Sequence, residues 1–188
     1  MNEEYGNRSL EWVSRESIKF SWQNLVKKVT AKKIQNTLLP LPGTVTWHPR
    51  AIAWAEEREA EIIHNGVPLN ATGVAVARSA GVVSPERIHL LIVHQLPLPE
   101  DAELRQAALL TGLLGPEMVG LTLGYGIYIC RGHESIDLLA HECRHVYQYE
   151  RAGSIGSFLP LYLQQIVTFG YKDAPFEVDA RAHERQQA

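Results

Sequence analysis

Residues 138–150, LLAHECRHVYQYE, place His141 and His145 four residues apart, with Glu142 directly after the first histidine. Four residues of an α-helix turn through about 400°, so the two imidazoles lie about 40° apart around the axis and about 6 Å apart along it. Two imidazoles so placed can bind one tetrahedral zinc ion at about 2.0–2.1 Å. Glu142 is rotated by about 100°, and its carboxylate can accept a proton from water at the metal. The spacing therefore predicts an HExxH zinc site with Glu142 as general base.

A hydrolytic zinc site usually has three protein ligands and one open position, so a third ligand is expected downstream. Glu177 is our choice, because it lies near the start of a predicted C-terminal helix that can pack against the HExxH helix. Asp173, Asp179 and His183 are competitors in the same segment. His183 is the most serious of them, since imidazole suits zinc at least as well as carboxylate.

The same residues permit less specific interpretations. The two histidines can lie on the polar face of an ordinary helix, and Glu177 can be a first-turn carboxylate that the helix macrodipole favours. The chain can then be a metal-free helical protein. It can also be a non-catalytic metallopeptidase-like module that binds or regulates a partner. We expect the zinc hydrolase, because the motif lies inside a predicted helix with Leu138 and Leu139 on its apolar side.

The elements that must position these residues follow from hydrophobic spacing and from glycine and proline. Strands are expected at 87–96 and 120–130, where β-branched and apolar residues gather. Helices are expected at about 51–64, 73–80, 99–114, 135–151, 157–170 and 175–186. A small sheet followed by a run of helices indicates an α+β fold. A turn is expected at 47–49.

The first 39 residues carry apolar side chains at near-helical intervals, and three prolines interrupt the pattern in 38–50. We therefore expect an N-terminal helical extension, 1–45, and a main domain, 46–188. All lysines but one lie between Lys19 and Lys33. They predict either a solvated helix face or a weak contact with a membrane or partner. Trp12, Phe20 and Trp22 suggest that this segment covers the active-site cleft.

Composition narrows the class of protein. A charged fraction of 21% and a net charge of −3 are ordinary for a globular domain and give no reason to expect nucleic acid as a partner. No integral membrane span is expected, because Pro116 and Glu117 interrupt the most apolar stretch, 107–130. No secretory signal is expected, because the opening MNEEYGNRSLEW has no positively charged start followed by an apolar run. Cys130 and Cys143 are expected to be reduced, in a cytoplasmic protein.

LLAHECRHVYQYE followed by YKDAPFEVDAR resembles the gluzincin branch of zinc metallopeptidases, over residues 120–183 or about a third of the chain. The compact minigluzincin-type members are the nearest in pattern, because Gln148 stands three residues after the second histidine. The resemblance implies a small zincin-like domain with a short mixed or antiparallel sheet. It also implies a peptidase with Zn²⁺ on His141, His145 and Glu177. An edge strand, here within 120–130, would bind the peptide or protein substrate in extended form.

One position departs from the larger gluzincins, which place an aspartate four residues after the third ligand to orient a histidine. Arg181 stands there in this chain, so support for the ligands is expected from Asp179 or Asp137 instead. Stabilisation of the oxyanion requires a further donor. Tyr171 and His183 are both plausible by their proximity to the third ligand, and the sequence does not choose between them.

Overall fold

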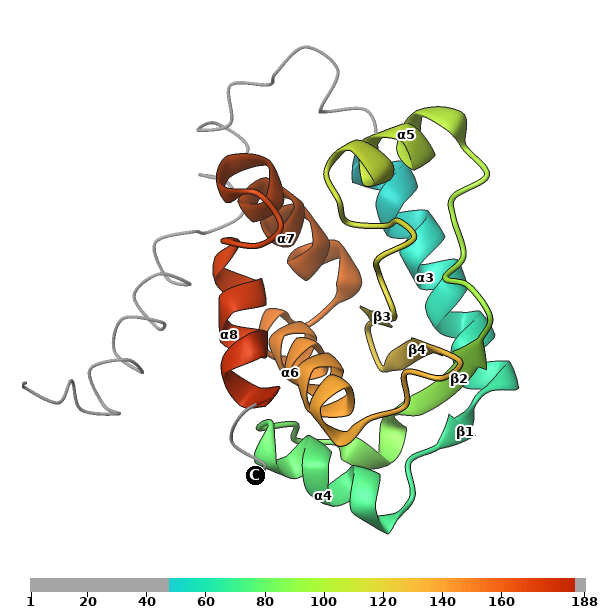
Figure 1. Cartoon of the computed structure of the whole chain (residues 1–188), viewed down its shortest axis with the longest axis vertical. Helices are drawn as coiled ribbons and strands as arrows, with labels where there is room; N and C mark the ends of the chain where they lie inside the picture. The colour runs from blue at the N-terminus through green and yellow to red at the C-terminus, as the bar shows by residue number, and fades with distance from the viewer. Residues whose placement is uncertain (1–47, 185–188) are drawn as a thin grey trace, which may run out of the picture. The chain divides into compact units, whose positions relative to one another are not determined.

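The structure, a computed structural model, describes residues 48–184. These residues form six α-helices, one short 3-10 helix and a four-stranded mixed sheet, so the predicted α+β class is confirmed (Figure 1). In chain order the elements are α3 (His48–Asn65), β1 (Val67–Pro68), α4 (Ala71–Ser79), η1 (Pro85–Arg87), β2 (His89–Val93), α5 (Ala102–Leu110), β3 (Gly120–Leu123), β4 (Gly126–Cys130), α6 (Ile136–Ala152), α7 (Ile155–Phe169) and α8 (Pro175–Glu184).

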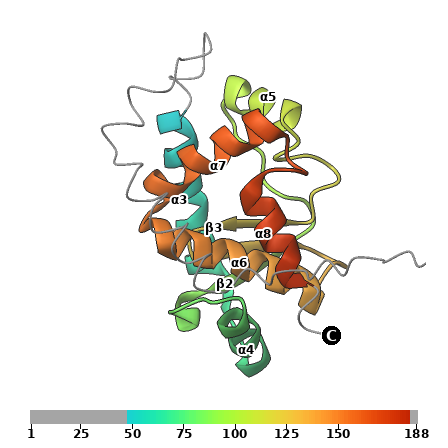
Figure 2. The ribbon, with the colours of Figure 1, turned by 90° about the vertical axis from the view of Figure 1, so that its left-hand side faces the viewer.

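The sheet has the order β1-β2-β4-β3, with β2 and β4 parallel and the two outer pairings antiparallel. Side chains alternate between the faces of a strand, and β4 shows both faces buried. Ile127 and Ile129 pack with α4 and α6, whereas Tyr128 and Cys130 belong to the core that includes α3 and α7. Helices therefore cover both faces, with α6 in front of the sheet and α3 behind it in Figure 2.

Several element boundaries differ from the predicted ones. The predicted strand 120–130 is a hairpin, in which Gly124 adopts a φ of 60° between β3 and β4. The turn predicted at 47–49 is wrong at Pro49, which lies in the first turn of α3, where its missing N–H costs nothing. Helix α7 begins earlier than the predicted residue 157, because the Ser154 side chain caps it by accepting a hydrogen bond from Ser157 N. Pro160 therefore lies inside this helix. β1 was not predicted.

Helix α6, which carries the HExxH motif, has sequence signals at both ends. The Ser135 side chain accepts a hydrogen bond from Leu138 N and so caps the first turn. Gly153 ends the helix with a φ of 92°, a conformation that favours glycine. These caps fix the helical register, so His141 and His145 share one face. Helix α8 packs against that face (Figures 1 and 2).

Three further predictions concern the N-terminal extension, membrane spans and the two cysteines. The N-terminal extension 1–45, its boundary and its proposed position over the cleft lie outside the described residues. Among helices within 48–184, none combines the length and the apolar character needed to cross a membrane. Cys130 and Cys143 are both buried and unpaired, and Cys143 packs in the apolar core.

Candidate metal centre

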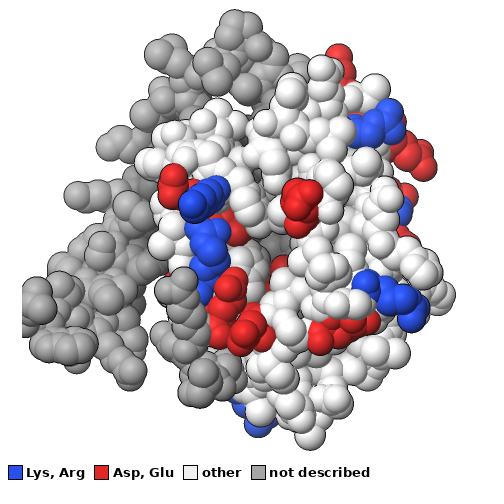
Figure 3. Space-filling model, viewed as in Figure 1, with Lys and Arg blue, Asp and Glu red and all other residues white. Residues whose placement is uncertain are grey.

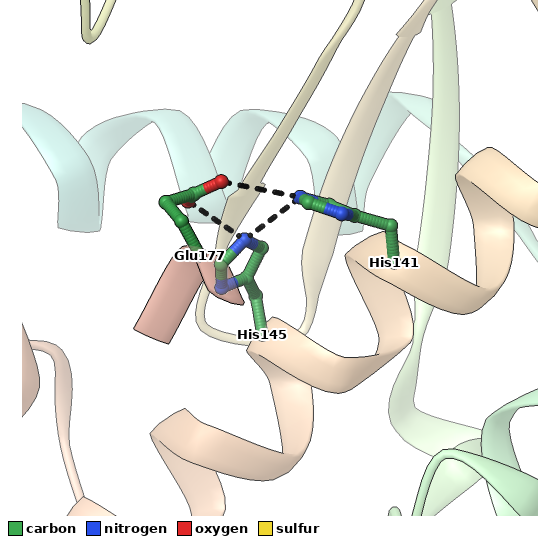
Figure 4. A group of neighbouring side chains, drawn as sticks. All are labelled: His141, His145 and Glu177. Carbon is green, nitrogen blue, oxygen red and sulfur yellow. Dashed lines mark hydrogen bonds and ion pairs between the residues drawn. The ribbon is translucent and has the colours of Figure 1, made fainter. Parts of the chain in front are cut away.

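Three side chains from α6 and α8 converge on one point (Figure 4). The Nε2 atoms of His141 and His145 lie 3.1 Å apart. Glu177 Oε1 lies 3.1 Å from His145 Nε2, and Glu177 Oε2 lies 3.6 Å from His141 Nε2. Ligands of a tetrahedral zinc ion at 2.0–2.1 Å are about 3.3–3.4 Å apart. Each of the three spacings is close to that value, with the two histidines nearest to different oxygens of the Glu177 carboxylate.

The outer ring nitrogens of both histidines are held by acceptors. His141 Nδ1 lies 2.6 Å from Glu184 Oε1. His145 Nδ1 lies 2.9 Å from Gln148 Oε1. Since each Nδ1 donates its hydrogen outward, each Nε2 can direct its lone pair at the common point. Such outer partners fix the tautomer and orientation of a metal-binding histidine.

The orientation of Gln148 follows from its other contacts. Its Nε2 donates to the Phe176 carbonyl oxygen at 3.1 Å and to Asp179 Oδ2 at 2.8 Å. Both partners are acceptors, so the amide nitrogen must face them and the amide oxygen must face His145. Arg144 binds Asp179 through two nitrogen atoms, at 2.7 and 3.0 Å. A chain of hydrogen bonds from α8 thus sets the ring of His145.

Glu177 is a fully buried carboxylate with one unsatisfied oxygen. Its Oε1 accepts from the Tyr162 hydroxyl at 2.7 Å. Its Oε2 accepts no hydrogen bond from the described residues, although Arg181 Nη1 approaches to 3.5 Å. A buried carboxylate oxygen without a partner is costly. A cation at the common point would satisfy Glu177 Oε2. This unsatisfied oxygen supports a metal site.

The pKa values of this group favour a positive charge beside Glu177. Burial opposes ionisation of Glu177 and protonation of His145, yet their mutual hydrogen bond and attraction reverse both effects. The pKa of Glu177 is lowered to about 2, and the pKa of His145 is raised to about 9. Burial and the charge of His145 lower the pKa of His141 to about 3. A proton on His145 fills the role that a metal ion would take, and binding a metal would displace that proton.

Glu142 lies beside the three converging side chains, only 4% exposed. Burial raises its pKa to about 7, while His145 and the Thr122 hydroxyl favour the ionised form. The hydroxyl donates to Glu142 Oε2 at 2.6 Å. A carboxyl group with a pKa near neutrality can both accept and return a proton, which is what a general base requires.

An apolar cavity opens next to these residues. Its empty space, with the open solvent at its mouth included, is about 940 Å³. Apolar side chains of α3, α5, α7 and β3 line most of it, and His141, Glu142, His145 and Glu177 are part of its wall. Figure 3 shows a hollow in this face of the molecule, with acidic side chains near it. The site therefore combines a group of polar, ionisable side chains with space for an apolar group.

The structure brings His141, Glu142, His145 and Glu177 together, as the sequence analysis expects. The competing third ligands lie elsewhere. Asp173 is exposed, and Asp179 binds Arg144 and Gln148. His183 directs Nδ1 at the Asp179 carbonyl oxygen, 2.8 Å away within α8.

The two candidates for the oxyanion donor, Tyr171 and His183, differ in their position relative to the cavity. Tyr171 lines the cavity with Glu142, whereas His183 does not. Burial raises the pKa of the Tyr171 hydroxyl, and the charge of Glu177 raises it further. Tyr171 is therefore a neutral hydrogen-bond donor in the cavity.

Sequence reasoning missed three residues that contact the site: Thr122, Tyr162 and Glu184. It also expected support for a ligand from Asp137 or Asp179. Asp137 is exposed and Asp179 acts through Gln148, whereas Glu184 contacts His141 directly. Glu184 follows Glu177 by seven residues, about two helical turns, so the same spacing argument could have found it. Thr122 and Tyr162 leave no such signal, because their contacts depend on how β3 and α7 pack.

Comparisons with family models, with curated proteins and with solved structures find no match to this chain.

Proposed function

We propose that this protein is a zinc-dependent hydrolase of amide bonds, with a zincin-like arrangement and peptides as its substrates. The observation that carries the proposal is the convergence of His141 Nε2, His145 Nε2 and a Glu177 carboxylate within 4.8 Å of one another. Two histidines and a glutamate are a donor set of hydrolytic zinc sites. A structural site would be closed by a fourth protein ligand, and the described residues offer none.

His141, His145 and Glu177 would hold the zinc ion. When bound, zinc would lower the pKa of water towards about 7 and polarise the carbonyl group of the substrate. Glu142 takes a proton at its carboxylate from the water that attacks the amide carbonyl and returns it to the leaving amine, a role that its position beside the three ligands allows. The Tyr171 hydroxyl lies in the same cavity and can donate a hydrogen bond to the developing oxyanion.

The surroundings of the site favour an extended peptide. β3 pairs only with β4 within the described sheet, so its other edge has unpaired backbone groups. An extended chain can add to such an edge by main-chain hydrogen bonds. The adjoining cavity is mostly apolar, which favours a substrate that carries an apolar side chain near the reacting amide.

The experiment that tests this function compares the full chain with two variants. Zinc content is measured by metal analysis, and turnover is measured on a mixed-sequence quenched-fluorescent peptide library. We expect one zinc per chain and peptide cleavage for the wild type. Glu142→Gln should retain zinc and lose about 10²–10⁴-fold in turnover, because it removes the general base. His145→Ala should lose zinc.

Each other outcome has a definite meaning. If the wild type binds no zinc, the metal centre is refuted. If it binds zinc but cleaves no more peptide than Glu142→Gln does, the catalytic proposal fails. The non-catalytic binding module then replaces it.

A further inference from the structure

The edge strand β3 directs two of its residues at the HExxH helix. Gly120 pairs with Ile129, and Thr122 pairs with Ile127. Residues directly opposite each other in an antiparallel pair point to the same face. Ile127 and Ile129 pack in the cluster that lies against α4 and α6. Gly120 and Thr122 therefore face α6, which carries Glu142.

Thr122 contacts one oxygen of the Glu142 carboxylate. Thr122 is 6% exposed, and its hydroxyl lies 2.6 Å from Glu142 Oε2. The same hydroxyl lies 3.1 Å from the Glu142 carbonyl oxygen. A threonine hydroxyl has one hydrogen to donate, and the carboxylate is the nearer acceptor. Glu142 Oε2 is thus occupied by this bond.

Gly120 makes space for the other oxygen. A Cβ atom at this position would lie 2.9 Å from Glu142 Cδ and closer still to Oε1. It would also lie 3.1 Å from Leu138 Cδ1. Gly120 does not have the positive φ that would require glycine for backbone reasons. Its lack of a side chain instead leaves room for the free end of the Glu142 carboxylate.

We propose that Gly120 and Thr122 are positioning residues that set the Glu142 carboxylate for proton transfer. Thr122 holds Oε2 in place, and Gly120 leaves Oε1 room to exchange the proton. One strand thus supplies both the edge offered to an extended substrate and the support of the base. The kinetic part of this inference rests on the proposed function, whereas the structural part does not.

Four variants of the full chain test the inference. Thr122→Val keeps the shape of the side chain but removes the hydroxyl, and Thr122→Ser restores it. Gly120→Ala adds the Cβ that displaces Oε1. Thr168→Val is the matched control, because the exposed Thr168 hydroxyl bonds only to the Gln164 carbonyl oxygen within α7. Crystal structures of the zinc-loaded proteins and turnover on the mixed-sequence peptide library are the two measurements.

In Thr122→Val and Gly120→Ala we expect the Glu142 carboxylate to move, while zinc content stays at the wild-type value. Misplacing a reacting group by about 1 Å can cost about 10²-fold, so kcat should fall about 10- to 100-fold with KM little changed. Thr122→Ser should recover most of this loss, and Thr168→Val should match the wild type. A merely structural role would lower the folded fraction and not separate kcat from KM.

A Glu142 carboxylate that stays in place in both variants would overturn the inference. So would a kcat in Thr122→Val equal to that of Thr168→Val when the wild type is active. If the wild type is inactive, the proposed function fails, and the crystallographic comparison still decides the positioning role. If Thr122→Val does not fold, Gly120→Ala carries the test, because the group it displaces is the flexible end of a side chain.

Discussion

Helix α6 has two buried sides of opposite chemistry. Its apolar side faces β4 and α4, where Cys143 and Val146 are 0% exposed. Its polar side faces α8 and the cavity, where His141 and His145 are 7% exposed and Gln148 is 3% exposed. The two sides are almost equally removed from water, but only one of them is made of residues that gain free energy from burial alone.

The two sides therefore have different roles: the apolar side stabilises the fold, and the polar side carries the candidate metal ligands. Burial of apolar surface contributes about 25 cal/mol per Å², so the apolar side stabilises α6 without further conditions. Buried ionic groups commonly give no net stability, because desolvation offsets their attraction. The polar side also leaves Glu177 Oε2 without a hydrogen bond. This unsatisfied oxygen is the feature that the proposed cation would complete.

The largest effect that would separate the two sides is the loss of a ligand. Glu177→Ala should weaken zinc binding by far more than the 10- to 100-fold that is typical of outer partners, because it removes the only anionic ligand. A competition titration with a chelator measures this. Glu103→Ala removes a carboxylate whose side chain is 79% exposed and should leave the zinc affinity unchanged. Equal zinc affinity in both variants would refute the ligand set.

The apolar side should show the reverse pattern. Ile127→Ala truncates a side chain that is 0% exposed in the cluster beneath α6. We expect the free energy of unfolding to fall by about 2–5 kcal/mol, measured by urea denaturation of the zinc-free protein. The zinc affinity of the folded protein should not change. A large loss of zinc affinity here would mean that the two sides of α6 are coupled.

A smaller effect should come from the outer partners on the polar side. Gln148→Leu leaves His145 Nδ1 without its acceptor, so the zinc affinity should fall about 10- to 100-fold. Gln164→Leu is the matched control on α7, since the Gln164 side chain is exposed and Gln164 does not line the cavity. If the two variants have the same zinc affinity, the chain of hydrogen bonds through Gln148 does not support the site.

The polar side was more open to prediction from the sequence than the packing around it. The helical period alone places His141 and His145 on one face, and the structure agrees. The choice of Glu177 needed only that a later helix turn back against α6. Thr122 could not be foreseen, because its contact depends on β3 lying beside α6 in one register. A hairpin at 120–130 was missed for a similar reason, since Gly124 and Tyr125 form the turn within a run of strand-forming residues.

Arg181 in α8 shows how a local pattern can mislead. Arg181 occupies the place where the larger gluzincins have an aspartate, and the structure pairs it loosely with Glu177 at 3.5 Å. Glu184, one turn further along α8, supplies the carboxylate to His141 Nδ1 instead. Glu184 reaches His141 because its side chain extends back over the same face of α8. Spacing therefore predicts the face of α8 better than it predicts the residue.

The smallest expected effect is a dependence on pH that only the polar side shows. In the zinc-free protein the folded pKa of His145 is about 9, against about 6.5 when unfolded. A group with a raised folded pKa contributes stability that is fully present below the unfolded pKa and is lost as pH rises through the folded one. Stability should therefore fall between about pH 7.5 and 8.5, by at most about 1.4 kcal/mol per pH unit. The window lies above the pKa of Glu142, about 7.

His145→Leu removes the ring that titrates in this window, and with it the charge that lowers the pKa of His141 and of Glu177. Urea denaturation at pH 7.5 and 8.5 should show a steeper loss of stability in the zinc-free wild type than in His145→Leu. Zinc should reverse the sign for the wild type, since the metal competes with the proton on His145 and binds more tightly as pH rises. Ile127→Ala should keep the pH dependence of the wild type at a lower absolute stability. Equal slopes in wild type and His145→Leu would mean that His145 and Glu177 do not share a buried proton, and the positive charge expected between them would lose its support.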